Sequence, residues 1–193
     1  ERQIDTYRRC GISDIIVVRG FAADKIAYPD VRYYENADYA ETNMVESLMA
    51  AKQEFDDDVI VSYSDILFEE GMLTGMMASA EDFAVAVDDN WQEYWKARYG
   101  KVDFDTESLP LDENDNIMEL GLEAPRLEEI DARYIGLLKF SKEGLAKVVE
   151  IFDRDYEAYR DKPWKQSGKT IRKAYMTDLL QAVIESGSHV KAV

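Results

Sequence analysis

The sequence contains few of the residues that form the reactive centres of many small proteins. Its 193 residues include one cysteine, Cys10, and one histidine, His189. A single cysteine excludes an intrachain disulfide and a cysteine-rich zinc site, and it favours a reducing, cytoplasmic location. Because no Asp-His-Ser arrangement surrounds the one histidine, neither a catalytic triad nor a histidine-based zinc site is expected.

Basic residues and long apolar runs are also scarce. The 23 Lys and Arg stand against 40 Asp and Glu, which gives a formal net charge of -17 at pH 7. Nucleic-acid polymers are bound largely through Lys and Arg at phosphates, so no such partner is expected. No apolar run approaches the roughly 18 residues of a membrane span, and no membrane association is expected.

Hydrophobic residues are plentiful enough for one folded domain. They make up 46% of the chain, and aromatic residues make up 11%. We therefore expect a single domain over residues 1–193. The sequence leaves open whether this domain forms a homo-oligomer.

Short apolar runs alternate with helical patterns over the first hundred residues. Strands are predicted over residues 14–20, 31–36, 57–65 and 83–88. Helices are predicted over residues 1–10, 23–28, 42–55, 69–80 and 90–100. This alternation indicates a mainly parallel mixed sheet with helices on both faces, which is a three-layer α/β architecture. The unbroken apolar run at residues 59–61 indicates a strand that is covered on both faces.

The pattern changes after residue 100. A β-hairpin is predicted over residues 107–121, with Asp115 and Asn116 in its turn. The remaining predicted elements are a strand over 132–141, helices near 142–160 and 169–186, and a short strand over 189–193.

The helix predicted over residues 42–55 has a recognisable start. Thr42 or Asn43 is expected to cap it, because Thr and Asn side chains accept hydrogen bonds from the first free N–H groups of a helix. Glu46 follows Asn43 at the spacing of a capping box.

A carboxylate closes the strand predicted over residues 57–65. In parallel α/β sheets, ligands bind outside the carboxyl ends of the strands, which is where Asp65 falls. A carboxylate there can hold Mg²⁺, which is commonly shared between one or two protein carboxylates and substrate phosphates. The alternative is a turn aspartate, or a cap on the next helix.

An aromatic stripe marks the helix predicted over residues 90–100. Trp91, Tyr94 and Trp95 share one helical face. Such rings can attract a cationic ammonium group through their quadrupoles, and Asp88 lies at the end of the preceding strand to add negative charge. The same spacing is also typical of a face packed into the core, and periodicity does not decide between the two.

Six segments in order resemble the phosphocholine and phosphonate cytidylyltransferases of the sugar-phosphate nucleotidyltransferase superfamily. They are "ERQIDTYRRCGISDIIVVRGF", "YYENADYAETNMVESL", "DDDVIVSYSDILFE", "AVAVDDNWQEYWKAR", "YIGLLKFS" and "AYMTDLLQAVIESG". The resemblance spans nearly the whole chain. It implies a Rossmann-like, GT-A-like nucleotidyltransferase fold with a β-hairpin insertion. It also implies a Mg²⁺-dependent reaction in which a phosphate or phosphonate oxygen of a small acceptor attacks the α-phosphorus of CTP and releases pyrophosphate.

The resemblance also implies roles for particular residues. Asp65 matches the aspartate that binds the catalytic magnesium. Asn43 and Ser47, and more weakly Thr42, match a segment that approaches the nucleotide base and the substrate. The aromatic stripe and Asp88 match the region expected to surround the ammonium end of the acceptor.

The sequence departs from the family pattern in three places. The glycine-rich signature GxGxRxxPxTxxxPK is missing, as is a later segment with a second magnesium aspartate, so we expect the natural protein to be longer at both ends. The sugar-phosphate branch carries "EKP" where this chain has "EAP" at residues 123–125, which argues against a sugar phosphate acceptor. A sugar-1-phosphate nucleotidyltransferase with another nucleotide is the alternative enzyme, and a noncatalytic binding or interaction domain of the same fold is the alternative of another class.

Overall fold

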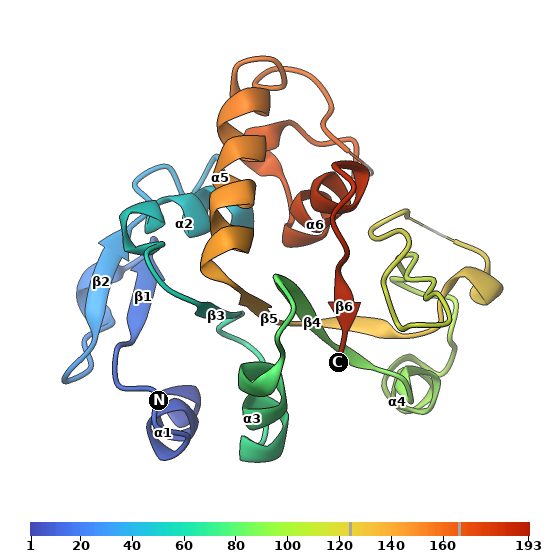
Figure 1. Ribbon diagram of the computed structural model, residues 1–193, viewed down its shortest axis with the longest axis horizontal. Coiled ribbons are helices and arrows are strands. Elements are labelled where there is room, and N and C mark those ends of the chain that lie inside the picture. Colours follow the sequence, from blue (N-terminus) through green and yellow to red (C-terminus); the bar gives the residue numbers. More distant parts are fainter. Residues whose placement is uncertain (124, 166) are drawn as a thin grey trace.

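The computed structural model describes residues 1–123, 125–165 and 167–193, and Figure 1 shows their arrangement. The α-helices are α1 (Arg2–Arg9), α2 (Met44–Met49), α3 (Glu70–Ala78), α4 (Trp91–Tyr99), α5 (Lys142–Tyr156) and α6 (Met176–Glu185). The strands are β1 (Ile16–Arg19), β2 (Arg32–Glu35), β3 (Val59–Ser62), β4 (Phe83–Asp88), β5 (Arg133–Phe140) and β6 (Lys191–Ala192). Short 3-10 helices lie at Ala23–Lys25, Lys52–Glu54, Leu127–Glu129 and Ile171–Lys173. No helix in this described part of the chain is long and apolar enough to cross a membrane.

The strands form two sheets between two layers of helices. β3, β5, β4 and β6 make one sheet in that order, while β1 and β2 make a separate parallel pair. β5 is antiparallel to β3 and to β4, and β6 is parallel to β4, so β3, β4 and β6 share one direction. Figure 1 shows α2, α5 and α6 on one side of the strands and α1, α3 and α4 on the other. The predicted three-layer α/β architecture with a mixed sheet is confirmed.

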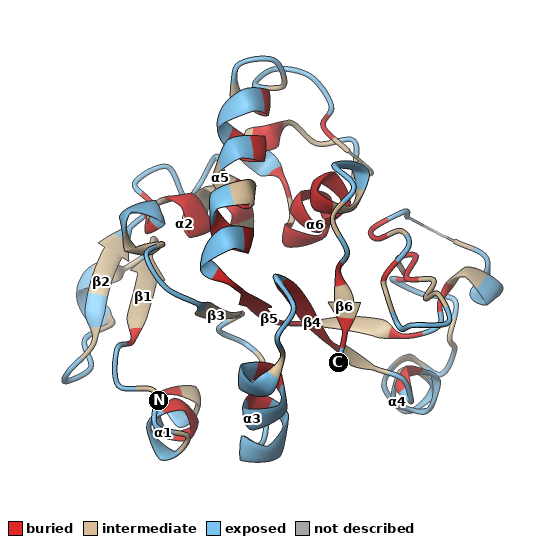
Figure 2. Ribbon diagram, viewed as in Figure 1, coloured by how far each residue is buried: buried red, intermediate tan, exposed pale blue. Residues whose placement is uncertain are grey.

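Buried residues lie in the central strands of the four-stranded sheet and on helices on both of its sides (Figure 2). On the side of α5 and α6, Val85 and Leu138 are fully buried in the largest core cluster. Their chain neighbours Ala84 and Leu137 belong to a smaller buried cluster with Met76 of α3. Because successive residues of a strand point to opposite faces, β4 and β5 contribute side chains to the buried clusters on both sides of the sheet.

β3 is less buried than these central strands. Val59 and Val61 pack against the larger core and Ile60 packs against the smaller clusters, so both faces are covered as predicted. All four residues of β3 and of β1 are nevertheless only half-buried. Among the described residues, β1 pairs with β2 alone and β3 with β5 alone. Each strand therefore has one edge whose backbone N–H and C=O groups lack a strand partner.

The predicted hairpin exists as isolated bridges and not as two regular strands. Leu111 pairs with Ile117 in an antiparallel bridge. The N–H of Asp115 donates to the carbonyl of Asp112 at 3.0 Å, so the turn runs over residues 112–115. The predicted turn over Asp115 and Asn116 is therefore placed too late. The reason is the Asp112 carboxylate, which accepts from the backbone N–H of Asn116 at 2.8 Å and closes the turn earlier.

The helix predicted over residues 42–55 is two shorter pieces. α2 ends at Met49, and a 3-10 helix follows at Lys52–Glu54. Asn43 is the N-cap, as predicted, because its side-chain oxygen accepts a hydrogen bond from the N–H of Met44 at 3.0 Å.

Gly136 allows the end of β3 to approach β5 closely. Its φ angle is +83°, and a Cβ atom at this position would lie 2.8 Å from the ring of Tyr63. The N–H of Tyr63 donates to the carbonyl of Gly136 at 2.9 Å, and its ring meets that of Tyr134 edge-on at 5.8 Å. Only glycine combines this backbone conformation with the absence of a side chain.

Gly136→Ala is expected to lower the free energy of unfolding by about 1–3 kcal/mol, because it adds left-handed strain and a steric clash. Gly75→Ala is the matched control, since a Cβ atom there would meet nothing within 4 Å. Because Gly75 lies inside α3, that substitution should stabilise by roughly 0.5–1 kcal/mol. Urea denaturation measures both changes, and a neutral Gly136→Ala would contradict the close approach.

Candidate active site

A large cleft of about 1060 Å³ opens beside β1 and β3. Its walls come from α1, β1, the start of α2, the segment before β3, β3 itself and the loop that follows it. Ile16, Val17 and Val18 of β1 and all four residues of β3 line it, so part of the wall is strand edge.

Four of the residues predicted from the sequence line this one cleft. Asp65 lies on the loop after β3, and its side chain is exposed. Thr42, Asn43 and Ser47 line the same cleft from the start of α2. The fold thus brings together two segments that lie far apart in the sequence. Their roles stay a prediction.

Asn36 is a residue that the sequence reasoning missed. It is 9% exposed, and its Nδ2 donates to Thr42 Oγ1 at 2.9 Å and to Ser47 Oγ at 3.1 Å. It thereby fixes the two hydroxyl groups that face the cleft. Like Asp65, it is the last residue of a strand predicted from the sequence, and this shared position is the signal that could have identified it.

Arg172 ties the segment before α2 to the rest of the domain. Its carbonyl accepts from the N–H of Asn43 at 3.1 Å, and its guanidinium donates to Asp38 Oδ2 at 2.8 Å. Its Nε lies 3.9 Å from Glu46 Oε1, and both atoms are buried with no hydrogen-bond partner among the described residues. The predicted capping box between Asn43 and Glu46 is therefore wrong, because this carboxylate faces the guanidinium.

The cleft is acidic, and its cations are already paired. Its carboxylates are Asp14, Glu54, Asp56, Asp57, Asp58 and Asp65. Arg32 pairs with Asp14 at 2.8 Å and with Glu54 at 2.6 Å, while Lys139 pairs with Asp58 at 3.1 Å. Hydrogen bonds from Tyr34 and Arg32 hold the pKa of Glu54 below its usual range. Among the described residues, Asp56, Asp57 and Asp65 have no ion-pair partner, so a bound cation would be held by free carboxylates.

These residues fit a magnesium ion that shares its ligands with a substrate. The described part of the chain contains no group of three or more His, Cys, Asp or Glu side chains that could hold a metal by themselves. Mg²⁺ does not need such a group, because it usually keeps several waters and binds one or two carboxylates together with substrate phosphates. Asp65 is exposed at the cleft and has no ion-pair partner among the described residues, so its carboxylate is available for such binding.

The aromatic stripe of α4 lies outside the cleft lining. Trp91 is 1% exposed, which favours the core alternative for this residue. Trp95 is half-buried, and the guanidinium of Arg133 lies 4.3 Å from its ring centroid. Tyr94 is 52% exposed. The aromatic face thus already contains a cation of the protein itself.

Asp88 has a local structural contact of its own. Its Oδ1 accepts from the N–H of Asn90 at 2.9 Å, which shapes the turn into α4. It also lies opposite Arg133 in the pairing of β4 with β5. The predicted acceptor residues therefore form one neighbourhood around Arg133, separate from the group that lines the cleft.

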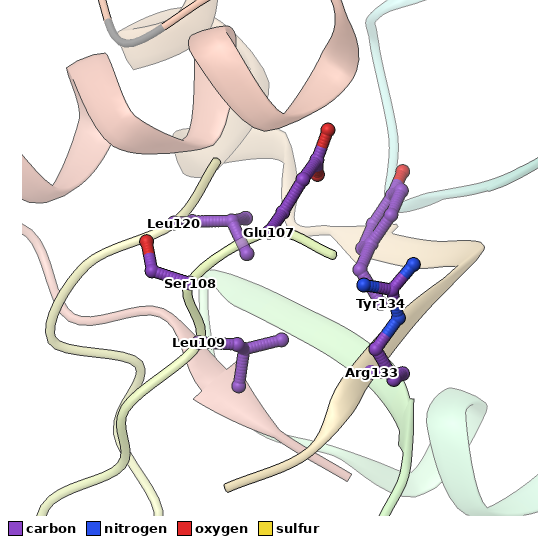
Figure 3. A pocket seen from close by; sticks show the side chains of 6 residues that line it. All are labelled: Glu107, Ser108, Leu109, Leu120, Arg133 and Tyr134. Carbon is purple, nitrogen blue, oxygen red and sulfur yellow. The ribbon is translucent and has the colours of Figure 1, made fainter. Parts of the chain in front are cut away.

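A second cavity, of about 20 Å³, lies beside β5 (Figure 3). Its lining residues are Glu107, Ser108, Leu109, Leu120, Arg133 and Tyr134. Burial raises the pKa of Glu107 and lowers the pKa of Arg133. A cavity of this size holds about one water molecule, so it has no room for a nucleotide or an acceptor. Ala124, which replaces the lysine of the sugar-phosphate branch, lies outside the described residues.

The fold is that of the nucleotidyltransferases. The inositol-1-phosphate CTP transferase of T. maritima matches with a TM-score of 0.66 and 14% identity, over 99% of this chain and 70% of that one. The CTP:phosphocholine cytidylyltransferase of Streptococcus pneumoniae matches with a TM-score of 0.62 and 16% identity, over 99% of this chain and 73% of that one. At such identities the likeness shows the fold alone, and it confirms the predicted Rossmann-like nucleotidyltransferase architecture.

Sequence similarity identifies the family. No protein-family model matches the chain. The curated CTP:phosphoglutamine cytidylyltransferase of Campylobacter jejuni is 33% identical in an alignment that is 205 residues long with its gaps and covers 99% of this chain and 78% of that protein. The chain therefore belongs to the cytidylyltransferases of the nucleotidyltransferase superfamily and is an enzyme of this class.

Arg172→Met tests how the α2 segment is held in place. It leaves the buried Oε1 atom of Glu46 without its cation, so the free energy of unfolding should fall by about 1–3 kcal/mol. Lys173→Met is the matched control, because Lys173 is exposed and its ion pair with Glu41 spans 3.8 Å. We expect that variant to change stability by less than about 0.5 kcal/mol in urea denaturation. Equal losses in the two variants would count against the role of Arg172.

Proposed function

We propose that the protein transfers CMP from CTP to a small phosphorylated or phosphonate acceptor that carries an amine or ammonium group, with Mg²⁺ as cofactor. The observation that carries this proposal is the single cleft lined by Asp65, Thr42, Asn43 and Ser47. The curated relative adds support, because its name describes a cytidylyltransferase that uses CTP and a phosphorylated acceptor.

In the proposed reaction, an oxygen of the acceptor's phosphate or phosphonate attacks the α-phosphorus of CTP. A new bond forms between this oxygen and the α-phosphorus, and the bond to the oxygen that bridges to the β-phosphate breaks. Pyrophosphate leaves with the electron pair of that bond. The protein's main tasks are to align the attacking and leaving oxygens and to exclude other geometries.

Asp65 is the proposed magnesium ligand. A bound Mg²⁺ neutralises charge on the triphosphate and on the developing transition state. A cation favours triphosphate binding here, because among the described residues Arg32 and Lys139 are already paired with carboxylates and the remaining acids repel a polyphosphate. In this proposal the carboxylate of Asp65 would hold the cation at the edge of the sheet.

Asn43 and Ser47 are the proposed contacts to the nucleotide base or the substrate, with Thr42 as a weaker one. The side-chain oxygen of Asn43 is used by the N–H of Met44, which leaves its two amide hydrogens for a ligand. Asn36 fixes the hydroxyls of Thr42 and Ser47 from behind. These polar groups can give the cleft specificity for the nucleotide base or the substrate.

The acceptor is proposed to be phosphocholine, 2-aminoethylphosphonate or phosphoglutamine. The last is included because it is named for the curated relative. For the ammonium end we propose Tyr94, the exposed part of Trp95, and Asp88. Trp91 supports Trp95 from the interior, with the ring centroids 6.3 Å apart.

Asp65→Asn tests the metal role. The amide has the shape of the carboxylate but lacks its charge, so pyrophosphate release from CTP should fall about 100-fold or more, with folding unchanged. Addition of EDTA should stop the wild-type reaction, and excess Mg²⁺ should restore it. Asp153→Asn, on the exposed side of α5, is the charge-matched control and should leave the rate unchanged. Full activity of Asp65→Asn would refute the role.

A panel of substrates tests the proposed acceptor class. Pyrophosphate release is measured with each nucleoside triphosphate and with phosphocholine, 2-aminoethylphosphonate, phosphoglutamine and glucose 1-phosphate. We expect CTP with phosphocholine, 2-aminoethylphosphonate or phosphoglutamine to give the highest kcat/KM. Tyr94→Ala should then raise the KM for that acceptor several-fold and leave the KM for CTP unchanged, because one cation-π contact is worth about 0.5–1 kcal/mol or more. Preference for glucose 1-phosphate would favour the sugar-phosphate alternative.

A further inference from the structure

One side chain from α1 contacts the loop that carries Asp65 at two points. Nε2 of Gln3 donates to the carbonyl oxygen of Tyr63 at 2.7 Å and to that of Ile66 at 2.5 Å. These two carbonyls stand on either side of Ser64 and Asp65. Gln3 is half-buried and itself lines the cleft.

Apolar contacts hold α1 in place, so Gln3 projects from a firm support. Ile4 and Tyr7 are buried in one cluster with Leu73 of α3. The ring of Tyr7 packs edge-on against Phe68, with 5.5 Å between the centroids. Because Phe68 and Leu73 both follow the loop in sequence, α1 holds the segment beyond Asp65 while Gln3 holds the turn itself.

The chemistry of this contact requires a primary amide. Its nitrogen has two hydrogens, and each can serve one carbonyl. A carboxylate of the same shape has no hydrogen to donate when ionised and would repel both carbonyls. Methionine matches the length of glutamine and donates nothing. The amide of Gln3 therefore holds the turn between Tyr63 and Ile66 in place, and with it the carboxylate of Asp65.

We propose that Gln3 is a positioning residue for Asp65. It fixes the turn so that the carboxylate faces the cleft and meets a divalent cation that is also bound by the nucleotide's phosphates. This inference rests on the proposed function, because it requires Asp65 to be a metal ligand. Removal of a group that orients a metal ligand typically weakens metal affinity or activity by about 10–100-fold.

Binding of Mn²⁺ to the full-length protein in the presence of CTP, followed by electron paramagnetic resonance, tests the proposal. Gln3→Met should raise the Kd for Mn²⁺ about tenfold or more and should speed hydrogen exchange at the amides of residues 64–66. Its Tm should stay close to that of the wild type, because the apolar anchors of α1 remain. Gln92→Met, on the exposed surface of α4, is the matched control and should change neither readout. Gln3→Glu keeps the shape and reverses the polarity, so it should weaken Mn²⁺ binding at least as much, and it serves as the second variant.

The double variant Gln3→Met with Asp65→Asn separates the possible failures. If Gln3 acts through Asp65, the double variant should bind Mn²⁺ no more weakly than Asp65→Asn alone. Additive losses, or wild-type Mn²⁺ binding and hydrogen exchange in Gln3→Met, would overturn the positioning role and leave the role of Asp65 intact. Wild-type Mn²⁺ binding by Asp65→Asn would instead overturn the proposed metal site, and the role of Gln3 with it.

Discussion

The point at which β3 stops pairing with β5 determines where the candidate active site lies. β5 runs antiparallel between β3 and β4, and its last pair along β3 joins Ser62 to Leu137. Immediately beyond, the left-handed backbone of Gly136 allows the ring of Tyr63 to lie against β5. The chain then leaves the sheet, so Asp65 stands at an open end and not in the packed interior.

The distribution of charge limits what the two candidate neighbourhoods can bind. In the described part of the cleft, Arg32 and Lys139 are both paired with carboxylates, so neither is free to neutralise a bound polyanion. Around α4 a cation of the protein is already present. The guanidinium of Arg133 lies over the aromatic face that was predicted to receive an ammonium group. The cleft therefore keeps unpaired carboxylates for a cation, whereas the aromatic face of α4 already contacts a cation of the protein. Trp91 illustrates why: periodicity identifies the face of a helix but not what covers that face.

Local patterns in the sequence predicted where most elements lie, but not all of their ends: the helix predicted over residues 42–55 ends at Met49, and the one predicted over 169–186 begins at Met176. Tertiary contacts decided these ends and the rest of the fold. Asp65 and Asn43 were identifiable because a residue after an apolar run and a cap before a helix follow from neighbouring residues alone. Gln3 and Arg172 were not, since each acts on a segment distant in sequence and carries no local signature of that contact. The direction of β5 was equally hidden, because the period of a strand is the same in parallel and antiparallel pairing. Asn36 lies between these cases. Its position at the end of a predicted strand could be read from the sequence, but its contacts with Thr42 and Ser47 are known only from the fold.

The central claim is that Asp65 links a divalent cation to a bound nucleotide in this cleft. A crystal structure of the full-length protein with CTP and Mg²⁺ tests it most directly. The account predicts a metal roughly 2.0–2.1 Å from a carboxylate oxygen of Asp65, with phosphate oxygens among its other ligands. A nucleotide bound in this cleft whose metal lies beyond the reach of Asp65, or a nucleotide bound elsewhere on the protein, would contradict it.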